Sequence, residues 1–400
     1  MKRFVGAVVC LALVAACSGG ATGPKAGDAL VVVSAPLTAQ PWIGEFLDKG
    51  ARLAAKQVLA QKGRHIRVEV LDNGGSAQTA AANARQAVQE GAVALITDGV
   101  GAEAIAAITD EAKLPVFITF DGGASFIDSK KHPTLFRMAP ANEAMCRRLA
   151  DYLADTQAKK TFALLSDDST YGRDGLANVK ADLLHDDVRV VSEQTVPEGA
   201  ADVSAQVRAA RSSGAQVLVL WAKATTVASV LRAVRSTGWD VKTFTGPSGE
   251  DPLVRQRLAD HPEWVDGLSF VSFRITSEVG GAPFAAYRKV YEGEYGPDKI
   301  GVKADGTDVI QPPDWSMYPY DAVILMKAAL DRAGSLDRAK VYDALLHVVI
   351  TGANGDERGF GPDDREGVSP DDMYFATFTH MRFHPNHDDQ LSTNLPEVPQ

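Results

Sequence analysis

A lysine follows a predicted buried strand, where a charged side chain needs a partner or contact with water. The run Val217–Trp221 has the apolar, β-branched composition of a buried strand, and Lys223 follows just before a helical pattern begins. A lysine ammonium at such a place would attract an anion. The alternative, which the residues alone leave open, is that the long side chain of Lys223 extends to solvent.

A glycine motif offers a second kind of chemistry. Residues 99–104 read G-V-G-A-E-A, which fits the dinucleotide motif G-x-G-x-x-A between a predicted strand and a predicted helix, with Asp121 further along the chain. The motif follows the third predicted strand instead of the first, so its expected context is missing. We therefore rank a dinucleotide-dependent enzyme below the other interpretations of this chain, and we expect no cofactor.

Histidines and carboxylates near the C-terminus resemble a zinc site only in composition, since zinc takes three or four nitrogen, sulfur or oxygen ligands. His380, His384 and His387 are followed by Asp388 and Asp389, but their spacing fits no common zinc template. We interpret them as a solvated tail and expect no metal. The sequence contains neither G-x-S-x-G nor H-E-x-x-H and shows no paired general acid and base, so we interpret the chain as not an enzyme.

Short apolar segments alternate with helical patterns along most of the chain, which predicts βαβ units and parallel sheets. The alternation begins at residue 29 and restarts at residue 161, so we expect two α/β units. Each should expose loops at the carboxyl ends of its strands, and a small molecule between those loops can draw the lobes together. Residues 296–319 are polar and Pro-rich and predict an irregular excursion, while residues 373–383 alternate like an antiparallel edge strand.

The composition is that of a globular protein with two domains. A chain of 400 residues is too long for one ordinary core, and 45% hydrophobic with 23% charged residues is usual for a folded protein. The formal net charge of −10 offers no basic stripe to phosphates, which argues against nucleic acid as a partner. We expect the protein to be a monomer.

The N-terminus predicts export. Lys2 and Arg3 precede an apolar run that is too short to span a bilayer and ends at Cys17, which is typical of a signal peptide. The run L-V-A-A-C resembles the bacterial lipobox, which implies that Cys17 carries a lipid anchor; the alternative is an ordinary signal peptide. Cys10 would leave with the signal and Cys146 then has no partner, so we expect no internal disulfide and a buried Cys146.

Segments spread along the chain resemble one known family. The stretch D-D-S-T-Y-G at residues 167–172 follows a predicted strand, and Y-P-Y-D-A-V at residues 318–323 opens a predicted helix. From residue 29 to residue 386 the chain is similar to periplasmic binding proteins of the leucine/isoleucine/valine type. The resemblance implies two Rossmann-like lobes that close over a ligand, and a substrate-binding subunit of an ABC importer with permease and ATPase partners.

The resemblance also implies a division of the chain into lobes joined by three hinge strands, near residues 136–142, 267–275 and 352–361. An alternative of another class keeps this fold but uses it as a sensor that presents its closed form to a membrane signalling partner. The expected parts are a lipoprotein signal peptide at 1–17, a tether at 18–28, a first lobe at 29–138 and 275–351, a second lobe at 139–274 and 352–390, and a tail at 391–400.

The resemblance finally implies where a ligand would bind. Family members that bind amino acids hold the carboxylate with hydroxyls after the third and fourth strands, and the ammonium with a glutamate in G-P-E-G and a nearby tyrosine. This chain has no serine after its third strand, Ser248 at the glutamate position and Lys223 at the tyrosine position. Lys223 and Ser248 would repel an ammonium group, so we expect an organic anion or amide in place of a branched-chain amino acid.

Further candidates surround these two residues. Accessible N–H groups of the glycine loop would favour an anion, and aromatic rings could form apolar walls. Asp98, Asp121 or Glu250 could instead receive a cationic group, which leaves open a zwitterion in reversed orientation. Tyr171 and Trp221 have structural alternatives, at a helix start and in the core. The predicted ligand-binding residues are Trp42, Gly99, Val100, Gly101, Phe120, Asp121, Gly122, Tyr171, Trp221, Lys223, Ser248 and Glu250.

Overall fold

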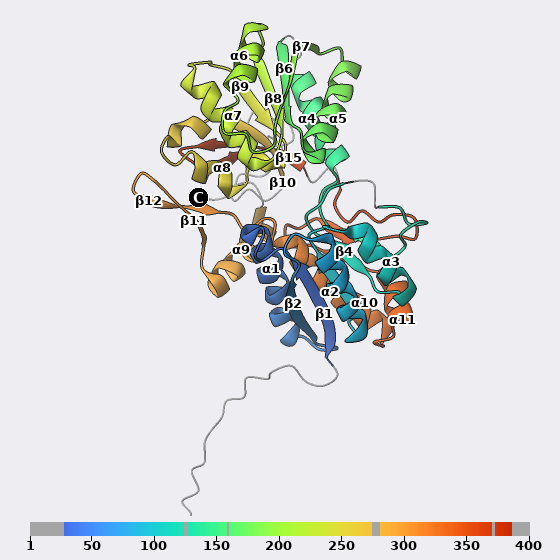
Figure 1. Cartoon of the computed structure of the whole chain (residues 1–400). Helices are drawn as coiled ribbons and strands as arrows, with labels where there is room; N and C mark the ends of the chain where they lie inside the picture. The colour runs from blue at the N-terminus through green and yellow to red at the C-terminus, as the bar shows by residue number, and fades with distance from the viewer. Residues whose placement is uncertain (1–27, 124–126, 158–159, 274–280, 370–372, 386–400) are drawn as a thin grey trace, which may run out of the picture.

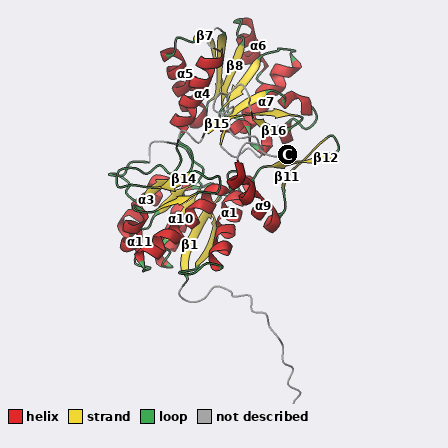
Figure 2. Ribbon diagram, turned by 180° about the vertical axis from the view of Figure 1, so that it is seen from behind, coloured by secondary structure: helices red, strands yellow, loops and turns green. Residues whose placement is uncertain are grey.

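The protein folds into two α/β lobes that meet in the middle of an elongated molecule (Figure 1). The structure, a computed structural model, describes residues 28–123, 127–157, 160–273, 281–369 and 373–385. In each lobe helices cover both faces of a largely parallel sheet, as the two opposite views show (Figures 1 and 2). This arrangement confirms the fold class that the alternation of strands and helices predicts.

In the first lobe the strands lie in the order β2-β1-β3-β4-β5, and each neighbouring pair is parallel. β1 is buried along its whole length, because helices cover both faces of the sheet and its sequence ALVVVSA is small or apolar throughout. The bounds are β1 (Ala29–Ala35), α1 (Pro41–Leu59), β2 (Ile66–Asp72), α2 (Ala77–Gln89), β3 (Ala94–Thr97), α3 (Ala102–Ala112), β4 (Val116–Ile118) and β5 (Leu135–Arg137).

In the second lobe the strands lie in the order β16-β15-β10-β9-β8-β6-β7. β6 to β10 are parallel, and β15 and β16 add antiparallel strands at one side. The bounds are α4 (Asn142–Gln157), β6 (Thr161–Asp167), α5 (Thr170–His185), β7 (Arg189–Val196), α6 (Ser204–Ser212), β8 (Val217–Trp221), α7 (Ala224–Ser236), β9 (Lys242–Thr245), η1 (Pro247–Gly249), α8 (Pro252–Arg257), η2 (Pro262–Val265), β10 (Leu268–Phe273), β15 (Met373–Thr379) and β16 (Arg382–Pro385).

The chain crosses between the lobes when it leaves the first sheet after β5, when it leaves the second sheet after β10, and when it rejoins the second sheet after β14. Between the second and third of these crossings, α10 packs along α1 and so belongs to the first lobe. The elements of this section are α9 (Gly281–Tyr295), β11 (Asp298–Ala304), β12 (Thr307–Gln311), α10 (Met317–Ala333), α11 (Arg338–Leu345), β13 (Val349–Thr351) and β14 (Glu357–Gly359).

The expectation of an irregular excursion at residues 296–319 is wrong, because β11 and β12 pair as an antiparallel hairpin. Its turn consists of Asp305 and Gly306, whose φ angles of 50° and 77° are both positive, as a type I′ turn requires. The Asp-Gly pair is itself a strong hairpin signal. Residues 311–319, which complete the predicted excursion, are all buried.

The tail that the sequence predicts as one edge strand is a hairpin too. Thr379 pairs with Arg382 across a turn made of His380 and Met381, whose φ angles are 49° and 61°. Histidine adopts such angles more readily than most residues but methionine rarely does, so the His-Met pair is only a weak turn signal. β15 pairs with β10 on its other side, which leaves β16 as the edge strand.

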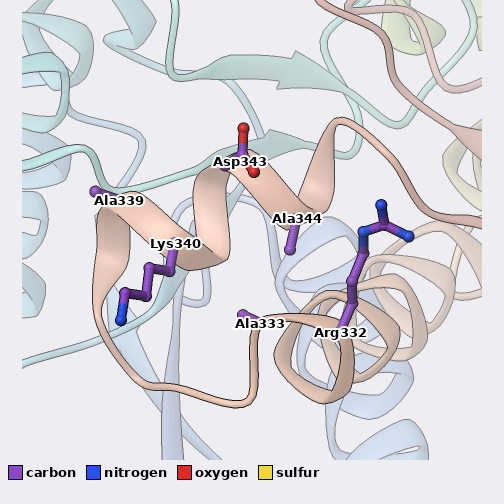
Figure 3. Close-up of a pocket in the computed structure, with 6 residues that line it drawn as sticks. All are labelled: Arg332, Ala333, Ala339, Lys340, Asp343 and Ala344. Atoms are coloured by element: carbon purple, nitrogen blue, oxygen red, sulfur yellow. The ribbon is translucent and has the colours of Figure 1, made fainter.

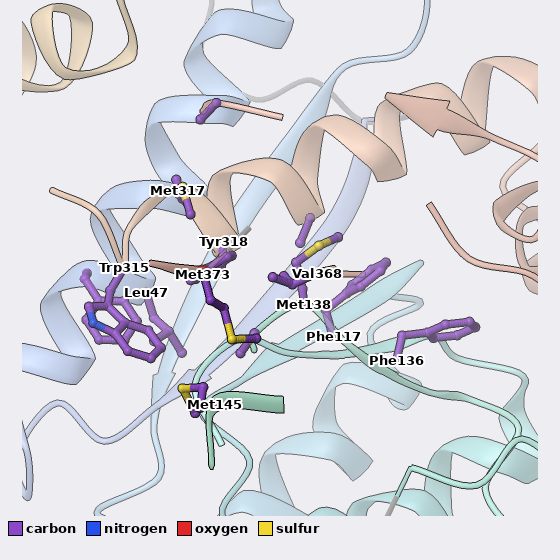
Figure 4. Packing of buried hydrophobic residues seen from close by; sticks show 14 of the residues in the cluster. Leu47, Phe117, Phe136, Met138, Met145, Trp315, Met317, Tyr318, Val368 and Met373 are labelled. Atoms are coloured by element: carbon purple, nitrogen blue, oxygen red, sulfur yellow. The ribbon is translucent and has the colours of Figure 1, made fainter. Parts of the chain in front are cut away.

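An apolar cluster continues from one lobe into the other at the crossings (Figure 4). Met138 lies on the first crossing, Met145 lies in α4 just after it, and Met373 follows the third crossing; all three belong to the same cluster as Trp315 and Tyr318. Unbranched methionine side chains fill such irregular joints well. Cys146 is fully buried in the same cluster, as expected of a small hydrophobic residue.

The motif Y-P-Y-D-A-V has a structural role in the first lobe. Asp321 of α10 accepts a hydrogen bond from the Ala353 N–H at 2.8 Å and lies with its Oδ2 3.4 Å from Nε of Arg358. Both charged side chains are fully buried, and burial raises the pKa of Asp321 to about 6 while Arg358 opposes that rise. The pair fastens residues 352–361 to α10 of the first lobe, whereas the expected division assigns them to the second.

Replacing Asp321 by alanine should lower the free energy of unfolding by about 3 kcal/mol, because the Arg358 guanidinium would stay buried without its main counter-charge. Urea unfolding measures this change. Lys180→Ala is the matched control: it removes a pair with Glu193 whose side chains are 38% and 48% exposed, and it should cost about 1 kcal/mol or less. Equal losses in the two variants would contradict the structural role of Asp321.

Candidate functional site

The loops after β3 and β4 form one hydrogen-bonded edge of the first lobe. The Asp121 N–H donates to the Asp98 carbonyl at 2.8 Å, and the Thr119 N–H donates to the Thr97 carbonyl at 2.9 Å. The Asp98 carboxylate accepts from Nδ2 of Asn73 at 2.9 Å, and burial raises the pKa of Asp98. These contacts hold the ends of neighbouring strands in register and engage the Asp98 carboxylate inside the lobe.

The glycines of this edge have a packing reason. A Cβ at Gly99, where φ is 116°, would lie 2.4 Å from the Cβ of Asp121. A Cβ at Gly101, where φ is 71°, would lie 2.8 Å from the Cα of Ala77 in α2. Both positions therefore need glycine for conformation and for space. The G-x-G-x-x-A spacing has this structural cause without any dinucleotide.

The N–H groups of the glycine loop are partly engaged. The Gly99 N–H donates to the Thr97 hydroxyl at 3.3 Å. The Asp98 carboxylate accepts from the Val100 N–H, which lowers the pKa of Asp98 against the effect of burial. The Gly99 N–H therefore already has a partner within the loop.

Arg137 fixes the loop after β4 to the crossings between the lobes. Its Nη1 donates to the carbonyls of Gly122 and Gly123, each at 2.6 Å, and its other nitrogens form a bidentate pair with Glu366, with Nε 2.7 Å from Oε2. Burial raises the pKa of Asp121, and the nearby Arg137 opposes that rise. The Gly122 carbonyl is therefore held in place beside the first and third crossings.

Aromatic side chains form a wall on the first lobe beside these loops. The ring of Phe120 lies 5.0 Å from that of Trp315 and 5.8 Å from that of Phe46, and Phe46 lies 5.5 Å from Trp42. Trp42 and Phe120 remain partly exposed, whereas Phe46 and Trp315 are buried. The structure thus joins two predicted residues, Trp42 and Phe120, through two that the sequence analysis missed. We call these four residues the aromatic wall.

Lys223 has a partner within the protein. Its Nζ lies 2.7 Å from Oε1 of Glu198 in the loop after β7, and the two side chains are 50% and 44% exposed. The Lys223 N–H donates to Oδ2 of Asp167 at the end of β6, at 2.8 Å. The ammonium that the sequence analysis assigns to an anionic ligand is therefore matched by a carboxylate of the same lobe.

Ser248, Tyr171 and Trp221 lie together in the second lobe. The Ser248 hydroxyl donates to the Ala222 carbonyl at 2.6 Å, and the Tyr171 hydroxyl lies beside Ser248. The rings of Tyr171 and Trp221 have their centroids 5.8 Å apart. Trp221 is fully buried, and a Cβ at Gly175 would lie 2.0 Å from its Nε1. The structure therefore places Trp221 in the core of the lobe.

Glu250 reaches across to the other lobe. It follows β9 in the second lobe and is fully buried, and its Oε1 accepts a hydrogen bond from Nε1 of Trp315 at 2.5 Å. Its Oε2 accepts from the Ser272 hydroxyl at 3.4 Å. Because Trp315 belongs to the aromatic wall of the first lobe, this hydrogen bond joins the loop edges of the two lobes.

Two more charged residues surround this contact. Asp314 precedes Trp315, Arg255 lies in α8, and both side chains are fully buried. Burial and the neighbouring Asp314 raise the pKa of Glu250, and burial also raises the pKa of Asp314. Burial lowers the pKa of Arg255 to about 10, so it stays charged at neutral pH. Two carboxyl groups facing one buried cation favour a proton on the pair.

Other chemistry is not found among the described residues. No group of three or more His, Cys, Asp or Glu side chains in that part of the chain could hold a metal ion. No helix there has the length and hydropathy needed to cross a membrane. Cys17, His387, Asp388 and Asp389 lie outside the described residues. A surface pocket at the opposite end of α10 from Trp315 takes no part in the site (Figure 3); it is lined by Arg332, Ala333, Ala339, Lys340, Asp343 and Ala344.

The paired lobes and their facing loop edges define a two-lobed α/β binding fold. The family model described as periplasmic binding protein matches residues 37–381, so the chain belongs to that family.

Named relatives agree with this assignment. An amino acid binding protein of Pseudomonas aeruginosa is 25% identical over 346 residues, which cover 84% of this chain and 87% of the relative. A branched-chain amino acid transporter substrate-binding protein from Streptococcus pneumoniae, solved with isoleucine, aligns over 89% of this chain and 98% of its own with a TM-score of 0.71 and 19% identity. A solute-binding protein of an ABC transporter from Rhodopseudomonas palustris, solved with 3,4-dihydroxybenzoic acid, aligns over 90% and 96% with a TM-score of 0.72 and 18% identity.

The buried carboxyl groups predict a pH dependence of stability. The pKa of Asp314 rises from an ordinary 3.8 to about 7 in the folded protein, so between these values the folded state binds protons that the unfolded chain has released. The free energy of unfolding should therefore fall as the pH rises from about 4 to about 7. Asp314→Asn should make this fall shallower in urea unfolding measured at about pH 5 and about pH 7.

Asp308→Asn is the matched control. Lys299 lowers the pKa of Asp308, so this carboxyl group makes the free energy of unfolding rise with pH, which is the opposite of the effect of Asp314. Asp308→Asn should not make the fall shallower. A pH slope that Asp314→Asn leaves unchanged would contradict the raised pKa.

Proposed function

We propose that this protein binds a small polar organic solute between the loop edges of its two lobes and delivers it to an ABC importer of the branched-chain amino-acid type. The observation that carries the proposal is that Glu250, in the loop after β9 of the second sheet, contacts Trp315, whose ring packs on Phe120 in the loop after β4 of the first sheet. Open α/β sheets bind ligands at this end of their strands. Membership of the periplasmic binding protein family supports the same role.

The solute we propose carries a carboxylate or an amide beside an apolar or aromatic part. Trp42 and Phe120 supply the partly exposed ring surface of the aromatic wall. A pair of half-exposed charges such as Lys223 and Glu198 contributes about 1 kcal/mol or less, so a solute carboxylate can replace Glu198 as the partner of Lys223. The isoleucine and dihydroxybenzoic acid bound by two proteins of the same fold support a solute of this size.

Other contacts at the same edges complete the proposed site. The Gly122 carbonyl already accepts from Nη1 of Arg137 and from the Asn142 N–H at 2.8 Å, so Gly122 holds the shape of the loop that borders the solute. Ser248 bonds to the carbonyl of Ala222, the residue before Lys223, and would offer its hydroxyl to the solute after giving up that bond, with the buried Tyr171 hydroxyl beside it. A site of this kind favours a solute with two separate polar groups.

We also propose that the protein is exported and anchored by a lipid on Cys17. The charged and apolar N-terminus with its L-V-A-A-C run supports this arrangement. An anchor would hold the binding protein, as a monomer, near the permease and ATPase subunits that we expect as partners. In this role the protein binds and releases its solute without catalysis.

A thermal-shift screen tests the proposal with leucine, isoleucine, 3,4-dihydroxybenzoic acid and the amides of all three. A solute at about a hundredfold excess over its Kd adds about 2.7 kcal/mol to stability, which raises Tm by a few degrees. Trp42→Ala should abolish most of that rise, because it removes the exposed ring of the aromatic wall. The control Trp264→Ala changes a partly buried ring in η2 that stacks on His261, and it should keep the rise.

Lys223→Ala separates the two ligand chemistries. For an acid, the apparent Kd taken from the Tm rise should increase at least tenfold. For the matching amide the Kd should stay nearly unchanged, because only the carboxylate pairs with the ammonium. No rise with any of the six compounds would contradict the proposed solute class. Equal losses for acid and amide would remove Lys223 from the site.

A further inference from the structure

The β11–β12 hairpin begins on the first lobe. Asp298 at its start lies 2.8 Å from Nζ of Lys49 in α1, and its other carboxylate oxygen accepts from the Tyr291 hydroxyl of α9 at 2.7 Å. Tyr295 at the end of α9 donates to the Lys49 carbonyl at 3.1 Å. The base of the hairpin is therefore attached to α1 through a buried or half-buried polar cluster.

The body of the hairpin packs on the second lobe. Ile300, Val302, Ala304 and Val309 are buried, and they belong to the same apolar cluster as Phe270, Phe378 and Phe383 of the second sheet. Nε2 of Gln256 in α8 donates to the Ile300 carbonyl at 2.8 Å. Both views place the hairpin at the edge of the second lobe, with its chain leading back to α9 of the first (Figures 1 and 2).

The end of the hairpin is held by Arg255. The guanidinium donates to Oε1 of Gln311, the last residue of β12, and to the Met381 carbonyl at 3.3 Å. It lies 4.8 Å from the ring centroid of Phe378 and 4.9 Å from that of Phe383. A fully buried guanidinium between two rings keeps its position only while these partners remain.

The chain then returns to the first lobe within a few residues. Pro312 and Pro313 follow Gln311, and Trp315 inserts into the aromatic wall while its indole donates to Glu250. Proline restricts the backbone, so this link between the two attachments is short and stiff. The hairpin is therefore fixed to the first lobe at both ends and to the second lobe along its apolar face.

We propose that the β11–β12 hairpin is an inter-lobe clasp that holds the lobes close together even without a solute. Separating the loop edges would expose the apolar face of the hairpin to water, and it would take Trp315 away from Glu250 and Gln311 away from Arg255. Both changes oppose separation. Solute binding to this protein then needs only a small further movement of the lobes.

The clasp rests on the proposed function in one respect, since lobe movement serves solute binding. Its test uses no solute, so the outcome is independent of the thermal-shift screen. A chain that binds none of the six compounds could still carry the clasp, and a chain that binds one of them could lack it.

Double electron–electron resonance between spin labels at Gln78→Cys in α2 and Ala205→Cys in α6 measures the separation of the lobes. Both positions are exposed near helix starts on opposite lobes, the buried Cys146 stays unlabelled, and Cys10 and Cys17 are replaced by serine in the full chain. The test variant is Val302→Asp, which puts a charge under the hairpin. The matched control is Lys303→Asp, which puts the same residue on its exposed face.

The solute-free protein should give a narrow distribution of label distances. Val302→Asp should shift this distribution to longer distances and broaden it, whereas Lys303→Asp should leave it unchanged. A second variant, with residues 300–309 replaced by a glycine-serine linker of equal length, should match Val302→Asp and does not depend on one substitution. The clasp is overturned if the unchanged hairpin already gives a broad distribution, or if both variants keep the narrow one.

Discussion

A buried hydrogen bond from the indole of Trp315 to the carboxylate of Glu250 joins the two lobes, and its requirements account for much of its surroundings. A carboxylate away from water needs donors and a nearby cation, which Ser272 and Arg255 provide. A buried indole needs apolar walls, which Phe46 and Phe120 provide. The loop after β9, the segment before α10 and the hairpin between them are therefore parts of one structure.

Three polar groups at the loop edges share a second property, which is that each has a partner inside the protein. Lys223 is paired with Glu198, the Ser248 hydroxyl with the Ala222 carbonyl, and the Gly99 N–H with the Thr97 hydroxyl. A solute at these edges has to exchange contacts instead of filling unpaired ones. Replacing one partner of an exposed ion pair by the solute costs little free energy, whereas breaking the buried Glu250 contact costs much more. The solute should therefore contact the exposed edges and leave the contact between the lobes in place.

The sequence predicts the fold well because its signals are local. A fully buried parallel strand such as β1 is a continuous apolar run, and most such runs are followed by a helical pattern. The β11–β12 hairpin also has a local signal in Asp305-Gly306, which the polar composition around it obscures. The turn at His380 and Met381 has only a weak local signal, because methionine rarely adopts a positive φ and the pairing of the flanking strands imposes it.

The site is predicted less well because its contacts are not local. The sequence identifies the loops after the strands and the rings of Trp42 and Phe120, since loop positions follow from the strand pattern. It does not show that Glu250 and Trp315, which are 65 positions apart, are hydrogen-bonded. It also does not show that Lys223 pairs with Glu198 in another loop. Partner choice between side chains far apart in sequence depends on packing, which one sequence does not display.

A double-mutant cycle between Glu250 and Trp315 tests the contact between the lobes most directly. Glu250→Leu removes the acceptor, Trp315→Phe removes the indole donor while keeping a ring, and the free energy of unfolding is measured for both variants and for the pair. If the contact joins the lobes as described, the double variant should lose less stability than the sum of the single losses, by at least about 1 kcal/mol. Losses that add to within about 0.5 kcal/mol would show that the two residues act independently and would contradict the account.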